Sequence, residues 1–161
     1  MRHPRPWRLA TDHNLLLSHK KSRSCEKIKL IGARVRDFLL PETIVREDGA
    51  GPRVELGAAK GTLIEVTLGI TRIIEQESLD VSIWGSADGV NWGSRPVARF
   101  PQKFYCATYS MHVDLADHPE IEYLQVRWKV NRWGRGEAPP LFEFYVFAQS
   151  VSSKAAAAPA A

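Results

Sequence analysis

The chain has 161 residues, of which 44% are hydrophobic and 25% are charged, and its formal net charge is +4. This length fits one domain, and the composition is that of a globular protein, which excludes a disordered or fibrous chain. No run of about 18 apolar residues occurs, so a membrane-spanning helix is excluded as well.

The net positive charge of the chain comes from its N-terminal region. Residues 1–36 carry ten basic and two acidic side chains, whereas residues 37–161 carry twelve basic and sixteen acidic ones. The body of the protein is therefore mildly acidic, and we expect it to bind no specific nucleic acid. We predict a disordered basic arm over residues 1–26, one domain over residues 27–150, and a disordered Ala-rich tail over residues 151–161.

The arm is short of apolar residues for a secretory signal. Its only apolar run is 15–17, whereas a signal peptide needs about 7–15 such residues. A transit peptide, a tail that touches an anionic partner and an extension without function remain the alternatives. The sequence therefore favours a cytoplasmic location.

The two cysteines, Cys25 and Cys106, lie 81 residues apart and lack the spacing of a zinc site or a disulfide framework. We expect a free thiol at Cys25 and a small buried side chain at Cys106. Two unpaired cysteines fit a protein of a reducing compartment.

Alternation with a period of two dominates residues 27–150. In residues 63–71 the even positions are all apolar, and most odd positions are Glu, Thr or Gly, which is typical of a half-buried strand. Similar patterns predict further strands at 79–84, 97–100, 104–113, 123–130 and 141–148, and weaker ones at 28–35 and 53–56. No window of ten residues shows a helical repeat. Eight strands joined by polar turns predict an all-β antiparallel sandwich of jelly-roll type.

A search for catalytic motifs finds no nucleophile elbow, zinc-protease helix, or glycine-rich nucleotide or phosphate loop. We therefore expect no enzyme activity and no cofactor. His112 and His118 could gather a metal ion or lie in a solvated turn, and Asp88 with Asn91 could bind calcium or shape an Asp-Gly turn. The turn is the favoured interpretation in both cases, so we predict no metal site.

The aromatic residues give a more specific indication. Trp133 lies in a predicted loop with Asn131, Arg132 and Arg135, and Trp84 lies on the polar face of its strand. Sugars present both CH-rich faces and hydroxyl groups, so an aromatic ring beside amide and charged groups suits them. These five residues are the candidate ligand-binding residues. The alternative is structural: Trp133 pins a long connection, and Trp84 is covered by a neighbouring loop.

The segment from Val81 to Trp92 consists of a strand followed by Ser86-Ala87-Asp88-Gly89-Val90-Asn91-Trp92. It resembles the strand–SxDGxxW–strand hairpin of discoidin-type domains, which are galactose-binding-like (coagulation-factor type C) jelly rolls. Residues 123–127 and 141–147 are similar to later strands of that family in order and spacing. A very similar hairpin also occurs in sandwich-like structural proteins of tailed phages.

The resemblance implies a module without catalysis. Discoidin-type domains bind glycans, lipid head groups or proteins through loops at one end of the roll. This chain differs from the secreted members because it lacks the two terminal cysteines that often bridge them. We expect a recognition module for a carbohydrate or protein ligand; the alternative is a structural subunit of a homo-oligomeric or phage-like assembly. An enzyme on the same scaffold is a third hypothesis, which a metal bound at His112 and His118 would support.

Overall fold

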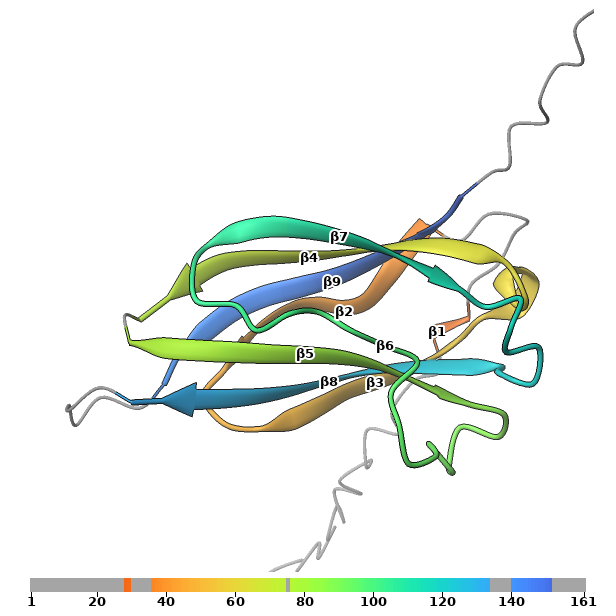
Figure 1. Cartoon of the computed structure of the whole chain (residues 1–161), viewed down its shortest axis with the longest axis horizontal. Helices are drawn as coiled ribbons and strands as arrows, with labels where there is room; N and C mark the ends of the chain where they lie inside the picture. Colours follow the sequence, from red (N-terminus) through yellow and green to blue (C-terminus); the bar gives the residue numbers. More distant parts are fainter. Residues whose placement is uncertain (1–27, 30–35, 75, 134–139, 152–161) are drawn as a thin grey trace, which may run out of the picture.

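The computed structural model describes residues 28–29, 36–74, 76–133 and 140–151. This part of the chain forms strands and one short 3₁₀ helix (Figure 1). In chain order they are β1 (Ile28–Lys29), β2 (Arg36–Val45), β3 (Gly49–Glu55), the 3₁₀ helix η1 (Gly57–Ala59), β4 (Leu63–Ile73), β5 (Glu77–Ser86), β6 (Ala98–Arg99), β7 (Ala107–Asp114), β8 (Tyr123–Arg132) and β9 (Phe142–Ser150). No helix in these ranges is long and apolar enough to cross a bilayer.

The strands lie in two facing sheets (Figure 1). Sheet A has the order β1-β3-β8-β5-β6, and sheet B has the order β2-β9-β4-β7. The two-residue pairing of β1 with β3 is parallel, and the other strand pairs are antiparallel. From β2 onward, each strand lies in the other sheet from the strand before it, except that β5 and β6 are neighbours in sheet A. This pattern is the jelly-roll arrangement. The predicted all-β antiparallel sandwich is therefore confirmed.

Alternating side chains from both sheets form the core. On β4 the even positions predicted to face inward, from Ile64 to Ile70, are buried, and their odd neighbours are mostly not. Leu79, Val81 and Ile83 of β5 face them from the other sheet and are fully shielded from solvent. Burial of each such side chain contributes roughly 1.5–3 kcal/mol, so the two-residue periodicity is what holds the sheets together.

Strand β2 departs from the prediction, which placed a weak strand at 28–35 and none over residues 36–45. Leu39 and Leu40 are consecutive and both buried, which breaks a simple alternation. The pairing with β9 absorbs this through register shifts on either side of Leu40. Pro41 is tolerated because β2 is an edge strand, where a missing N–H costs no ladder bond.

The segment from Asp88 to Ala107 is less regular than predicted. Ala98 and Arg99 are the only residues of it that pair with β5 as a strand, and Lys103 adds a single bridge to Leu79, so the Asp-Gly turn opens a long loop rather than a tight hairpin. The strand expected at 104–113 begins at Ala107, and Cys106 precedes it as an exposed free thiol. The predicted burial of Cys106 is wrong: it lies before β7, whose first two residues, Ala107 and Thr108, are themselves exposed. Cys25 lies outside the described residues.

Gly69 of β4 is required by close packing on the outer face of sheet B. Tyr145 of β9 pairs with it, and the tyrosine ring lies where a Cβ on residue 69 would project. The ring therefore rests flat on the strand. Phe38 packs edge-on against the same ring, with their centroids 5.8 Å apart.

Gly69→Ala should lower the free energy of unfolding by about 2 kcal/mol, because the new methyl group must displace the Tyr145 ring. Urea denaturation of the variant measures the loss. In a Tyr145→Ala background the same change should cost less than about 0.5 kcal/mol, since the obstacle has been removed. Equal losses in the two backgrounds would contradict this explanation.

Candidate functional site

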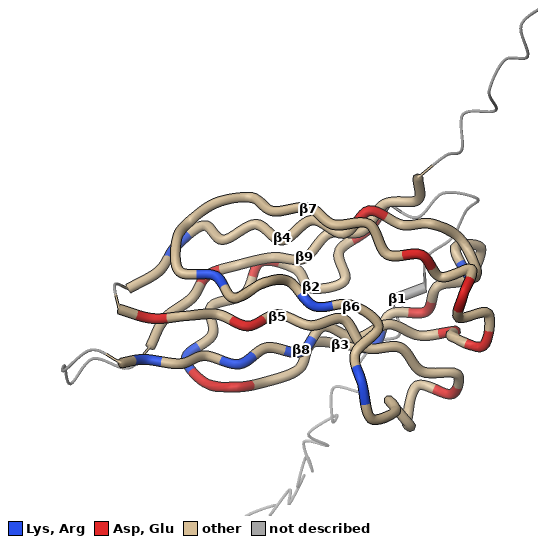
Figure 2. Tube along the Cα trace, in the orientation of Figure 1, with Lys and Arg blue, Asp and Glu red and all other residues tan. Residues whose placement is uncertain are grey.

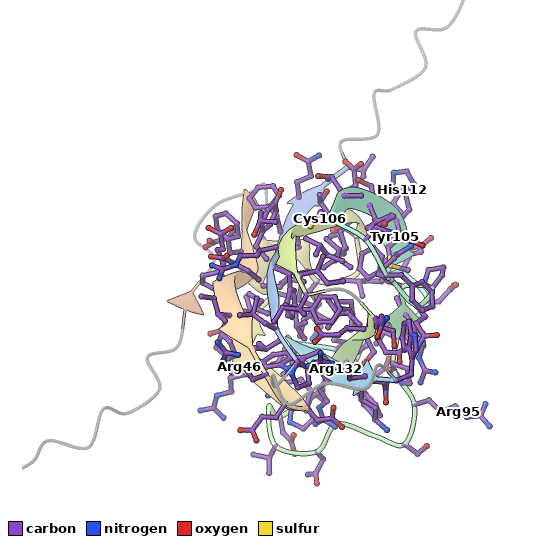
Figure 3. All side chains as sticks on the ribbon, turned by 90° about the vertical axis from the view of Figure 1, so that its left-hand side faces the viewer. Arg46, Arg95, Tyr105, Cys106, His112 and Arg132 are labelled. Atoms are coloured by element: carbon purple, nitrogen blue, oxygen red, sulfur yellow. The ribbon has the colours of Figure 1, made fainter. Side chains whose placement is uncertain are left out.

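Three exposed aromatic side chains gather at one end of the sandwich: Phe104, Tyr105 and Trp133, here called the end cluster. Their exposed fractions are 39%, 75% and 59%. The ring centroids of Phe104 and Trp133 are 5.7 Å apart in an edge-on contact, and those of Phe104 and Tyr105 are 6.4 Å apart. Figure 3 looks onto this end of the molecule, with Tyr105 labelled. Contiguous exposed aromatic surface of this kind is typical of interaction sites.

The first strand residues of β5 bring the cluster together. Leu79 exchanges main-chain hydrogen bonds with Lys103 on one side, at 2.8 and 2.9 Å. On the other side β5 pairs with β8, and the Trp133 N–H donates to the Gln76 carbonyl at 3.3 Å. Phe104 and Trp133 therefore follow two segments that are both fixed to β5.

A polar network lies beside the cluster on the outer face of sheet A. The Gln102 amide donates to Ser78 Oγ at 2.9 Å and to Asp80 Oδ2 at 3.2 Å. The Asn131 amide donates to the same Asp80 oxygen at 3.3 Å. One carboxylate thus orients two amides, leaving amide oxygens and exposed carboxylate lone pairs for a ligand.

Arg132 does not belong to this surface. Residues of β8 alternate between the faces, and Arg132 shares the inward side with Val126 and Val130. Its Nε lies 4.0 Å from Oε1 of Glu77, a carboxylate fully shielded from solvent, while Glu77 Oε2 accepts the Leu141 N–H at 2.9 Å. Among the described residues, Glu77 Oε1 and Arg132 Nε and Nη1 lack a hydrogen-bond partner. Arg132 is labelled at this end in Figure 3, and its position indicates a structural role.

Trp84 occupies a separate place on sheet A. It is half-buried, and its indole N–H donates to Ser82 Oγ at 3.0 Å. The Arg127 guanidinium lies over the Trp84 ring, 4.5 Å from its centroid, and 5.7 Å from the centroid of Trp92. Arg127 is itself oriented by a 3.0 Å bond from its Nε to Gln125 Oε1. Arg127 thus covers one face of Trp84.

The structure therefore unites two of the five predicted residues, Trp133 and Asn131. Arg132 points inward, Trp84 lies further along the sheet, and Arg135 lies outside the described residues. Phe104, Tyr105 and Gln102 were not among the predicted site residues. Phe104 and Tyr105 are adjacent aromatic residues shortly after Pro101, and two adjacent aromatic residues break the alternation expected of a strand, which could have pointed to them.

Asp88 and Asn91 form the turn that was favoured over a calcium site. Asp88 Oδ1 accepts the Asn91 N–H at 2.7 Å and the Val90 N–H at 2.8 Å, and Asn91 Nδ2 donates to its other oxygen. These bonds, led by the one from the Asn91 main chain, hold the pKa of Asp88 far below its usual range. In the part of the chain that the structure describes, no three His, Cys, Asp or Glu side chains come together as metal ligands.

Comparison with protein-family models and with curated proteins finds no match for this chain. The two-sheet antiparallel sandwich is compatible with a discoidin-like fold.

Arg132→Met should lower the free energy of unfolding by roughly 2 to 3 kcal/mol, because it leaves the Glu77 carboxylate buried beside an apolar group. Chemical denaturation at neutral pH measures this. Adding Glu77→Gln should recover most of the loss, since the amide oxygen still accepts the Leu141 N–H without a buried charge. A double variant no more stable than Arg132→Met would argue against the pair.

Proposed function

We propose that the chain is a recognition module without catalysis that binds carbohydrate at the end cluster. The observation that carries the proposal is the contact between exposed Phe104 and Trp133 beside the Asn131–Asp80–Gln102 network. Aromatic rings stack on the CH face of a sugar, and the amides and the carboxylate exchange hydrogen bonds with its hydroxyl groups. Both kinds of group are needed, and they occur together here.

The cluster is also prepared for binding. Its segments are fixed to β5 by main-chain hydrogen bonds, and the edge-on aromatic contact restrains the rings. A ligand then needs to order few side chains, which lowers the entropic cost of association.

The sequence resemblance to discoidin-type domains supports the same proposal. Members of that family recognise ligands through loops at one end of a jelly roll, and the end cluster lies at one end of this sandwich. The SxDGxxW segment has a structural role, because the side chains of Ser86 and Asp88 form hydrogen bonds within the turn. The ligand contacts are therefore assigned to the end cluster and not to this motif.

Trp133→Ala should weaken binding of a responsive oligosaccharide about thirtyfold, or about 2 kcal/mol, the usual cost of truncating a central aromatic contact. The measurement is a titration of a glycan panel followed by tryptophan fluorescence and calorimetry. Trp92→Phe, remote from the cluster, is the matched control and should bind like the parent chain. Absence of binding across the panel, or full binding by Trp133→Ala, would refute the proposal.

A second candidate function, a subunit of a homo-oligomeric assembly, is favoured by the edge of β7. This strand pairs with β4 in unbroken register over its eight residues and contains no proline. The Leu115 N–H donates to Thr62 in the same register, so alternation turns the N–H groups of Thr108, Ser110 and His112 toward the free edge. A regular strand edge such as this one can pair with another strand.

If β7 mediates assembly, Ser110→Pro should shift the chain from oligomer to monomer in size-exclusion chromatography with light scattering. The proline removes an N–H that points away from β4, so the fold itself should be retained. Ser110→Ala keeps this N–H and serves as the control. A parent chain that is monomeric at tens of micromolar would exclude the assembly.

A further inference from the structure

The outer face of sheet A carries a group of cations that the end cluster does not use. Arg127, Ser82 and Arg99 lie side by side across β8, β5 and β6, and Lys129 pairs with Asp80 in the neighbouring row. Figure 2 shows basic residues following one another along β8. We call Arg99, Arg127 and Lys129 the cationic row.

Two shallow hollows meet at the cationic row. One, of about 460 Å³, is lined by Ala50, Ser82, Arg127 and Lys129 among others. The other, of about 280 Å³, is lined by Asp80, Ser82, Arg99 and Lys129. Ser82 and Lys129 border both, so the hollows form one surface groove that crosses the sheet from β3 to β6.

The three cations of this groove outnumber the acidic residues that line it, Asp48 and Asp80. None of the three cations forms an ion pair with a described residue. Asp80 accepts hydrogen bonds from the Gln102 and Asn131 amides, and Asp48 accepts the Val130 N–H. Arg127 is held in place by Gln125 and by the Trp84 ring, so its remaining N–H groups present a fixed positive charge. An anionic group in the groove would relieve the mutual repulsion of the row.

The groove is continuous with the end cluster along β8. Asn131, Lys129 and Arg127 occupy alternate, outward positions, and Trp133 follows them. At about 3.3 Å per residue, Trp133 and Arg127 are roughly 20 Å apart along the strand. One extended chain could therefore contact the aromatic rings at one end and the cations at the other.

We propose that the ligand is an acidic glycan, with uronate or sulfate groups, that extends from the end cluster along β8 into the groove. The end cluster binds the sugar faces, and Arg99, Arg127 and Lys129 bind the acidic groups. This inference rests on the proposed carbohydrate-binding function and specifies its ligand class.

The same surface fits a single-stranded nucleic acid less well. The Arg127 guanidinium already lies over the rings of Trp84 and Trp92, so these rings are not free to stack on bases.

The experiment compares hexameric oligogalacturonate with its fully methyl-esterified form by calorimetry, because esterification removes the charges and leaves the sugar backbone unchanged. Sulfated chondroitin oligosaccharides and a neutral cello-oligosaccharide extend the panel. The acidic forms should bind about tenfold or more tightly than the ester, and this advantage should shrink at high salt. The double variant Arg99→Gln/Lys129→Gln, which keeps Arg127, should reduce the advantage at least threefold and leave binding of the ester unchanged.

Arg72→Gln removes one exposed positive charge from sheet B and should leave the preference intact. Equal affinity for acid and ester, or an acid preference that is undiminished in the double variant, would overturn this inference while the carbohydrate function stands. Tighter binding of single-stranded oligothymidylate would overturn it in favour of nucleic acid. Binding of none of the glycans would refute both proposals.

Discussion

The register of β8 in the middle of sheet A is the constraint on which the structure and its surface depend. β8 pairs with β5 over ten consecutive residues, so a slip by one position would exchange the two faces of the strand. Two contacts from the β2–β3 turn fix it: Trp128 Nε1 donates to the Glu47 carbonyl, and the Val130 N–H donates to Asp48 Oδ1. The same register sends Val126 into the core and Arg127 onto the groove, which links stability to recognition.

The two outer faces of the sandwich differ in chemistry, because different side chains pack on each sheet. On sheet B, Gly69 makes room for the Tyr145 ring, and Phe38 packs edge-on against Tyr145 and Phe147. That face is aromatic and held by its own contacts. On sheet A the central positions are arginine, lysine and serine, with Trp84 lying beneath a guanidinium. Ring contacts within the protein thus occur on both faces, and Phe38 on sheet B is as exposed (40%) as Phe104 of the end cluster (39%).

The strands with clear alternation could be predicted from the sequence, because burial on one face dictates the residue at every second position. β4 is of this kind, whereas Asn131 and Trp133 are picked out by their side-chain chemistry and not by alternation, which predicts a strand only as far as residue 130. β2 could not be predicted in this way, because its two adjacent buried leucines and Pro41 require bulges, and a two-residue alternation does not indicate bulges. The inward position of Arg132 follows from β8 continuing to residue 132, beyond the predicted end at 130. Phe104 joins Trp133 through pairings on opposite sides of β5, which local sequence does not contain.

Two residues of the end cluster lie directly after main-chain positions that are paired with the sheet. Phe104 follows the Lys103–Leu79 bridge, and Trp133 follows the last residue of β8. Phe104 is therefore one residue from a fixed main-chain bond, and the Trp133 N–H makes such a bond itself, so the sheet fixes the main chain that carries both rings. Because Asn131 belongs to the same strand as Lys129 and Arg127, a ligand that contacts the rings is directed along β8. Under the proposed function, the cations and the aromatic residues therefore contact one ligand, in an order set by the strand.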